Sequence, residues 1–124
     1  MKFLVVDDSA TMRRIITTSL EQIGYTDFVE ASNGFEALAK FSESIQFVIT
    51  DWSMPVMSGI ELIRKLRARP DGKTVPVLMV TTNNTKEDVV VAAQAGANGF
   101  LVKPISLQGL KEKIEAILNP REPC

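Results

Sequence analysis

The chain alternates short apolar runs with longer amphipathic segments, and this alternation is the strongest constraint on its fold. Each of the five runs is four to six residues long, contains β-branched side chains and is almost continuously apolar. Strands that are buried on both faces of a parallel sheet have this composition, whereas half-exposed strands alternate between apolar and polar residues. We therefore expect five parallel strands, at residues 3–6, 28–31, 47–50, 75–80 and 99–102.

The segments between the runs carry apolar residues at helical spacing. One face of the first segment is formed by Met12, Ile15, Ile16, Leu20 and Ile23. One face of the last is formed by Leu107, Leu110, Ile114, Ile117 and Leu118. A shorter helix that ends before Pro70 is indicated by Ile60, Leu62, Ile63 and Leu66. The pair Asn33-Gly34 opens a further helix, in which we expect three residues to face inward: Phe35, Leu38 and Phe41.

The segment at residues 86–95 is ambiguous, because Val89, Val90 and Val91 have low helix propensity and would also suit a strand. We interpret it as a helix because three charged residues precede the valines and alanines follow them. A right-handed crossover between parallel strands also requires a helix here. Together the segments predict an α/β fold of the (βα)₅ type, with one doubly wound, five-stranded parallel sheet in a single domain covering residues 1–124.

Charge and residue content exclude several classes of function. Lys and Arg total 14 and Asp and Glu total 15, so no excess of positive charge favours nucleic acid or an anionic membrane. No apolar run approaches the about 20 residues of a membrane-spanning helix, and the N-terminus lacks the features of a signal peptide. We therefore expect a cytoplasmic protein. The sole Cys, Cys124, can form neither an internal disulfide nor a zinc site.

The chain contains no histidine. This excludes a Ser-His-Asp triad, a Cys-His pair and a histidine-ligated metal. Any phosphate chemistry that proceeds through a phosphohistidine must take that group from another protein.

Chemically active residues follow four of the five predicted strands. The first strand is followed by Asp7 and Asp8, the third by Asp51, the fourth by Thr81 and the fifth by Lys103. Because ligands of open parallel sheets bind beyond the carboxyl ends of the strands, these side chains should meet at one edge. Three carboxylates there would repel one another unless a cation lay among them, and all-oxygen ligation with few protein ligands suits Mg²⁺.

The same edge is suited to phosphoryl chemistry. A carboxylate such as Asp51 can act as a nucleophile and form an acyl phosphate. Mg²⁺ and Lys103 would stabilise the charge of the transferring group, and Thr81 could donate a hydrogen bond to a phosphoryl oxygen. Each residue alone also has an ordinary structural interpretation, since an Asp pair often caps a turn and a lone Lys is usually a solvated charge. The phosphoryl interpretation depends on their joint placement.

Four motifs resemble the receiver domain of two-component response regulators: VVDDS, VITDWSMPVMSG, the TT after VPVLMV, and FLVKP. The match runs through essentially the whole chain, in order and at the expected spacing. The segments MRRII and AQAGANGFLVKP are most similar to the chemotaxis members of the family. The resemblance implies a flavodoxin-like sheet with strand order 2-1-3-4-5, and a receiver domain without an effector domain.

The resemblance also implies a role for each residue of the acidic edge. Asp51 matches the phosphoacceptor, and Asp8 and Asp51 match the direct Mg²⁺ ligands. Asp7 matches a ligand that acts mainly through water, and Ser53 matches the residue whose backbone carbonyl completes the metal site. Ser53 and Asn83 occupy positions that tune dephosphorylation in the family.

A second group of residues matches the switch and the output surface of the family. Thr81 matches the switch hydroxyl, Lys103 the phosphate-pairing lysine and Phe100 the rotating aromatic side chain. The bond between Lys103 and Pro104 matches a cis peptide bond. Phe100 stands where chemotaxis members often have Tyr, and Thr82 stands where a smaller residue is common. The partner-binding surface is matched by Asn84, Val89, Ala93, Phe100, Val102 and Lys113.

We therefore expect a signalling switch, not an enzyme, which catalyses only its own phosphorylation and dephosphorylation. The resemblance implies a monomer that is phosphorylated by a histidine kinase of the CheA type and then binds a flagellar motor switch protein of the FliM type. A phosphorelay intermediate or adaptor receiver with another partner is the alternative, and the existence of a dedicated phosphatase stays open. A flavodoxin-type cofactor carrier is disfavoured, because Asp7 and Asp8 would repel a flavin phosphate after the first strand.

Overall fold

Five parallel strands form one sheet in the computed structural model, which describes residues 1–119; Cys124 lies outside this range. The strands are β1 (Lys2–Val6), β2 (Asp27–Ala31), β3 (Phe47–Thr50), β4 (Val77–Thr81) and β5 (Gly99–Val102). The helices are α1 (Ala10–Ile23), α2 (Gly34–Lys40), α3 (Gly59–Ala68), α4 (Lys86–Ala95) and α5 (Leu107–Leu118), with a short 3₁₀ turn, η1 (Pro70–Gly72). The sheet order β2-β1-β3-β4-β5 confirms the predicted (βα)₅ fold and the strand order 2-1-3-4-5.

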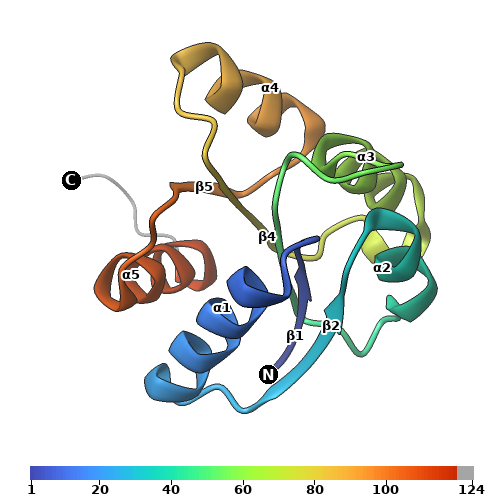
Figure 1. Ribbon diagram of the computed structural model, residues 1–124. Coiled ribbons are helices and arrows are strands. Elements are labelled where there is room, and N and C mark those ends of the chain that lie inside the picture. The colour runs from blue at the N-terminus through green and yellow to red at the C-terminus, as the bar shows by residue number, and fades with distance from the viewer. Residues whose placement is uncertain (120–124) are drawn as a thin grey trace.

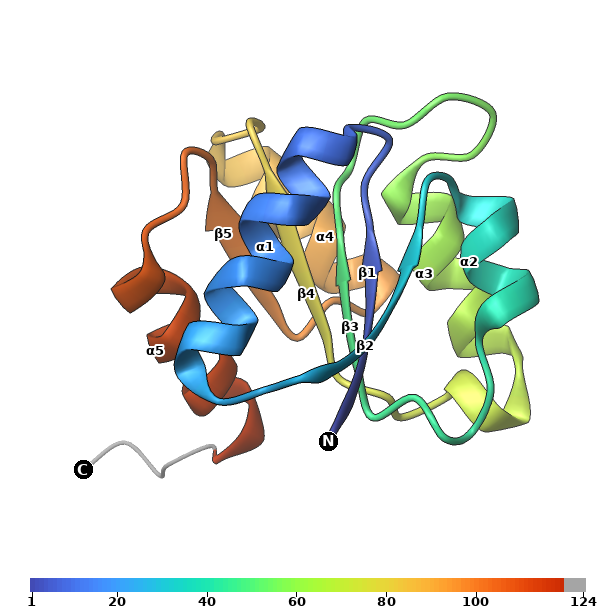
Figure 2. The same cartoon turned by 60° about the horizontal axis from the view of Figure 1, so that its bottom comes forward.

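Helices cover both faces of the sheet, with α1 and α5 on one face and α2, α3 and α4 on the other (Figure 1 and Figure 2). Side chains of each strand alternate between the two layers, which explains the almost continuous apolar runs. The α1–α5 core is formed by Phe3, Val5, Ile16, Leu20, Phe47, Ile49, Leu78, Val80, Leu110 and Ile114. The α2–α4 core includes Leu4, Val6, Ala37, Val48, Leu62, Ile63, Leu66, Val77, Met79 and Ala92.

Each of the five α-helices begins with a polar side chain that accepts a hydrogen bond from a backbone N–H three residues on. These N-caps are Ser9, Asn33, Ser58, Thr85 and Ser106. In α4 the N-cap Thr85 and Asp88 form a reciprocal capping box, and Gly96 ends the helix in the left-handed region. These signals outweigh the low propensity of the valines and confirm the predicted fourth helix. No helix among residues 1–119 is long and apolar enough to cross a membrane.

The start of β4 differs from the expectation. The strand begins at Val77, not at residue 75, because Pro76 has no N–H to donate to a neighbouring strand. Its carbonyl still accepts a hydrogen bond from Val48 at 2.9 Å, so the chain enters the sheet at this residue.

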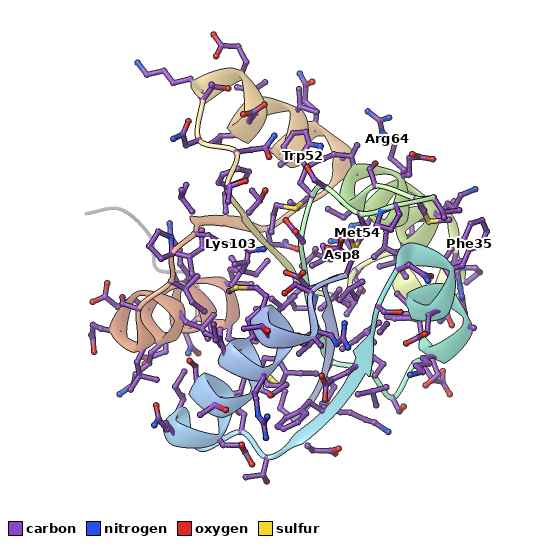
Figure 3. All side chains as sticks on the ribbon, in the orientation of Figure 1. Asp8, Phe35, Trp52, Met54, Arg64 and Lys103 are labelled. Atoms are coloured by element: carbon purple, nitrogen blue, oxygen red, sulfur yellow. The ribbon has the colours of Figure 1, made fainter. Side chains whose placement is uncertain are left out.

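Three residues predicted on the apolar faces of helices prove to be exposed. Phe35 lies in the first turn of α2 and is 58% exposed, so the prediction that it faces the core is wrong (Figure 3). The short α2 buries a face formed by Gly34, Ala37 and Phe41, which Phe35 does not share. Ile15 lies at the edge of the apolar face of α1 and is 44% exposed, and Leu107, the first residue of α5, is 43% exposed.

Candidate functional site

The carboxyl ends of β1 and β3 are neighbours in the sheet, and they bring three acidic residues together. Asp7 and Asp8 follow β1, and Asp51 follows β3. One carboxylate oxygen from each residue lies within 4.8 Å of the others. Asp7 and Asp51 are buried whereas Asp8 is exposed, so the cluster opens to solvent at Asp8. Figure 3 shows Asp8 near the middle of the view, with Lys103 reaching in from the loop after β5.

Asp7 is held by donors from three parts of the chain. The backbone N–H of Ser9 donates to Oδ1 at 2.9 Å, and Nζ of Lys103 donates to Oδ2 at 2.9 Å. The guanidinium of Arg13 donates to the backbone carbonyl of Asp7 at 2.6 Å and pairs with Glu30 at 3.2 Å. Both carboxylate oxygens of Asp7 therefore have protein partners, whereas the carboxylate of Asp8 faces solvent.

The carboxylate and backbone of Asp51 are fixed from several sides. The backbone N–H of Trp52 donates to Oδ1 at 2.7 Å, and Nζ of Lys103 donates to Oδ2 at 3.2 Å. The backbone N–H of Asp51 donates to the carbonyl of Val6 at 3.0 Å, which ties it to β1. Gly59, at the start of α3, packs so closely that a Cβ there would overlap the carbonyl oxygen of Asp51. Glycine at this position lets α3 begin directly behind the acid.

Lys103 bridges the two buried acids. Its amine lies 3.2 Å from a carboxylate oxygen of Asp51 and 2.9 Å from one of Asp7. Burial of the amine alone would lower the pKa of Lys103, but the hydrogen bond to Asp7 and the negative charges of Asp51 and Asp7 outweigh burial, and the pKa is raised. The amine is therefore charged at neutral pH. The peptide bond between Lys103 and Pro104 is cis, as predicted. The backbone N–H of Lys103 donates to the carbonyl of Thr81 at 2.8 Å.

Thr81 ends β4 and is fully buried. Its hydroxyl donates to Oδ1 of Asn83 at 3.1 Å and accepts from the backbone N–H of Asn83 at 3.3 Å. The structure therefore places Thr81 at the expected edge, but it directs the hydroxyl proton to Asn83.

The groups at this edge suit a small hard cation and a phosphoryl group. The three carboxylates supply only oxygen ligands, which is the donor set that Mg²⁺ prefers. Ser53 lies in the loop two residues after Asp51, and its side chain is exposed. Lys103 supplies a fixed positive charge beside Asp51, and Thr81 supplies a hydroxyl on the adjacent strand. Within residues 1–119, these acids are the one cluster of potential metal-ligating side chains.

The predicted output surface lies along α4, β5 and α5. A groove of about 330 Å³ separates these elements, and its lining includes Val89, Ala93, Phe100 and Lys113. Asn84 and Val102, the other two predicted residues, are exposed outside this lining. Phe100 is half-buried against the α2–α4 core, and its ring meets Trp52 edge to face, with centroids 6.5 Å apart. Because Trp52 follows Asp51, this contact connects the acidic edge to the groove.

Comparison with known proteins identifies the family. Residues 3–115 match the response regulator receiver domain. The chain belongs to the response regulator receiver family. This receiver is 46% identical over 124 residues to chemotaxis protein CheY1 of Helicobacter pylori, covering 98% of this chain and 100% of that protein. It is 50% identical over 120 residues to chemotaxis protein CheY of Pseudomonas aeruginosa, covering 96% and 97% of the two chains.

Solved structures agree with the sequence comparison. The structure of Vibrio cholerae chemotaxis protein CheY4 matches this receiver with a TM-score of 0.87 and 35% identity, covering 94% of this chain and 97% of that chain. A receiver domain protein from Clostridium thermocellum matches with a TM-score of 0.84 and 32% identity, covering 95% and 94% of the two chains. This receiver is therefore of the CheY type found among chemotaxis response regulators, which confirms the predicted family.

Two further contacts near the acidic edge of this receiver were not expected from its sequence. Arg13 reaches the carbonyl of Asp7, and Asn83 engages both sides of the Thr81 hydroxyl. The segment MRRII indicates a basic residue on α1, but it does not show which group the side chain contacts. The contact of Asn83 depends on the conformation of the turn after β4. A polar residue two positions after a strand-end hydroxyl is the signal that could have suggested the second contact.

Proposed function

We propose that this receiver is a signalling switch that takes a phosphoryl group onto Asp51 and binds its output partner in the phosphorylated state. The observation that carries the proposal is the position of Asp51, which shares one cluster with two further acids and contacts the ammonium of Lys103. A nucleophilic carboxylate, an acidic metal site and a fixed cation are the groups that phosphoryl transfer requires.

Asp51 acts as the nucleophile. A bond forms between a carboxylate oxygen of Asp51 and phosphorus while the bond from phosphorus to the donor nitrogen breaks, and the donor imidazole leaves. The chain has no histidine, so the donor is a phosphohistidine of another protein, a histidine kinase of the CheA type. The N–H of Trp52 orients the carboxylate of Asp51 for attack. Mg²⁺ held by Asp7, Asp8, Asp51 and the carbonyl of Ser53 would supply positive charge opposite the phosphoryl oxygens.

Lys103 and Thr81 complete the acceptor site. Lys103 is charged and already within 3.2 Å of Asp51, so it can pair with a phosphoryl oxygen while it keeps its hydrogen bond to Asp7. The hydroxyl of Thr81 can donate to a second phosphoryl oxygen from the neighbouring strand. Attack of water on the acyl phosphate restores Asp51, so the receiver acts only on itself and is a switch, not an enzyme.

The output of this switch is binding of a flagellar motor switch protein of the FliM type to the groove between α4, β5 and α5. The chemotaxis relatives and the exposed valines beside the groove support this partner. When Thr81 turns toward the phosphoryl group, Phe100 can move inward behind it. Burial of a Phe side chain contributes about 1.5–3 kcal/mol, which is enough to shift a two-state equilibrium.

Acetyl phosphate tests the acceptor without any kinase, because the receiver supplies the nucleophile and the charged groups. We expect a mass increase of one phosphoryl group in the presence of Mg²⁺, and no increase for Asp51→Asn. Lys103→Ala should fold but lose output binding. Intact-mass detection of a stable phosphoryl adduct on Asp51→Asn would contradict the assignment.

Binding to the purified motor switch protein, with and without beryllofluoride as an acyl-phosphate mimic, tests the output. We expect beryllofluoride to increase binding, and Phe100→Ala to weaken the increase. A receiver that is labelled at Asp51 but does not bind the motor switch protein would instead be a phosphorelay intermediate or an adaptor with another partner.

A further inference from the structure

The hydroxyl of Thr81 is occupied on both sides by one residue. It donates its proton to Oδ1 of Asn83 at 3.1 Å, and it accepts from the backbone N–H of the same residue at 3.3 Å. Thr81 is fully buried, so its hydroxyl is shielded from bulk solvent in this conformation. Asn83 is only half-buried and lies in the loop between β4 and α4.

A hydroxyl has one proton, so it can donate to one acceptor at a time. A hydrogen bond from Thr81 to a phosphoryl oxygen on Asp51 is therefore incompatible with the hydrogen bond to Asn83. The two acceptors compete for the same proton, and binding of the phosphoryl group must break the contact with Asn83.

The backbone of Thr81 stays in place during this exchange. Thr81 pairs with Val102 of β5, and its carbonyl accepts from the N–H of Lys103 at 2.8 Å. Only the side chain of Thr81 has to turn. Because Asn83 is half-exposed, its released amide oxygen can be hydrated, so breaking the contact leaves no buried acceptor without a partner.

We propose that Asn83 is a positioning residue that holds the proton of Thr81 in the resting state and thereby weakens binding of the phosphoryl group. This inference rests on the proposed function. In Asn83→Ala the backbone N–H of residue 83 can still donate to the hydroxyl of Thr81. The hydroxyl proton, however, has lost its acceptor in the resting state. The phosphorylated state is unaffected, because there the proton goes to a phosphoryl oxygen. The resting state is then less stable relative to the phosphorylated state, and the switch responds to lower concentrations of a phosphoryl mimic.

The experiment titrates beryllofluoride in the presence of Mg²⁺ and follows the fluorescence of Trp52, which adjoins Asp51. The wild type is compared with Asn83→Ala, Thr81→Val and the double variant, as a double-mutant cycle. We expect Asn83→Ala to tighten binding about five-fold, which corresponds to one net hydrogen bond of about 1 kcal/mol. In the Thr81→Val background the same substitution should change nothing, and Thr81→Ser, which restores a hydroxyl, should restore the effect.

Gln94→Ala is the matched control, because it removes an exposed side-chain amide on α4, and it should bind beryllofluoride as the wild type does. Equal affinity of the wild type and Asn83→Ala for beryllofluoride would overturn the inference. An equal effect of Asn83→Ala in the wild-type and Thr81→Val backgrounds would also overturn it, because it would mean that Asn83 contacts the ligand directly. A wild type that shows no response to beryllofluoride would overturn the proposed function, and the inference with it.

Discussion

Val56 adopts a backbone conformation that its side chain disfavours. Its φ is 73°, and the N–H of Met57 donates to the carbonyl of Pro55 at 2.8 Å, so Val56 is the central residue of a tight three-residue turn. A β-branched residue at positive φ costs about 1–3 kcal/mol. Val56 is also 79% exposed, so packing of its side chain does not compensate for this cost. The strained turn lies in the loop between β3, which ends just before Asp51, and α3.

Substitution of Val56 by Gly should raise the free energy of unfolding by about 1 kcal/mol, because glycine adopts positive φ without steric strain. Urea denaturation measures the change. Val56→Ala keeps a Cβ and therefore most of the strain, so it should be close to the wild type. A lower unfolding free energy for Val56→Gly would show that the valine side chain makes a stabilising contact in this loop.

Arg67 of α3 links this helix to the C-terminal end of α4 through hydrogen bonds. Its guanidinium donates to the carbonyl of Gly96 at 2.7 and 3.2 Å, to the carbonyl of Gly72 at 2.9 Å and to Oδ1 of Asn98 at 3.0 Å. Burial lowers the pKa of Arg67, yet the group stays charged at neutral pH. Asn98 also accepts from the N–H of Val77 at 2.9 Å. One side chain thus joins α3, η1 and the turn between α4 and β5.

Replacement of Arg67 by Met should lower the free energy of unfolding by about 2 kcal/mol, because carbonyls of Gly96 and Gly72 lose a charged donor. Hydrogen exchange should accelerate at the end of α4 more than in α1. Arg64→Met removes an exposed charge from the same helix and should change stability by less than about 0.5 kcal/mol. Equal effects of the two substitutions would contradict the role of Arg67.

The elements could be predicted more fully than the contacts between them. Asp7, Asp8 and Asp51 were expected together because the carboxyl ends of neighbouring parallel strands meet at one edge. The contacts of Arg13 and Arg67 could not be predicted, because a long side chain that reaches a distant backbone carbonyl leaves no periodic pattern in the sequence. The prediction that Phe35 faces the core is wrong because the buried face of the short helix α2 is formed by small residues. An aromatic residue in the first turn is therefore not a sign of the buried face in this helix.

The molecule as a whole carries unbalanced negative charge at one edge, where three carboxylates share one lysine. A cation that binds only the folded state raises stability by mass action, by about 2.7 kcal/mol at one hundred times its dissociation constant. We therefore expect Mg²⁺ to raise the melting temperature and to change the fluorescence of Trp52. Asp8→Asn should lose both effects, whereas Glu43→Gln, which removes an exposed acid elsewhere, should keep them. An unaltered Mg²⁺ response in Asp8→Asn would count against this site.

The sheet also divides the interior of the molecule into two cores, and Trp52 and Phe100 both pack against only one of them, the α2–α4 core. Substitutions in the α1–α5 core can therefore alter resistance to heat without altering the packing of Trp52 and Phe100. Selection can therefore act on stability at these positions while the contact between Trp52 and Phe100 is kept. A lineage that moves to a warmer habitat would then have buried positions, those of the α1–α5 core, that can change without altering the packing of Trp52 and Phe100.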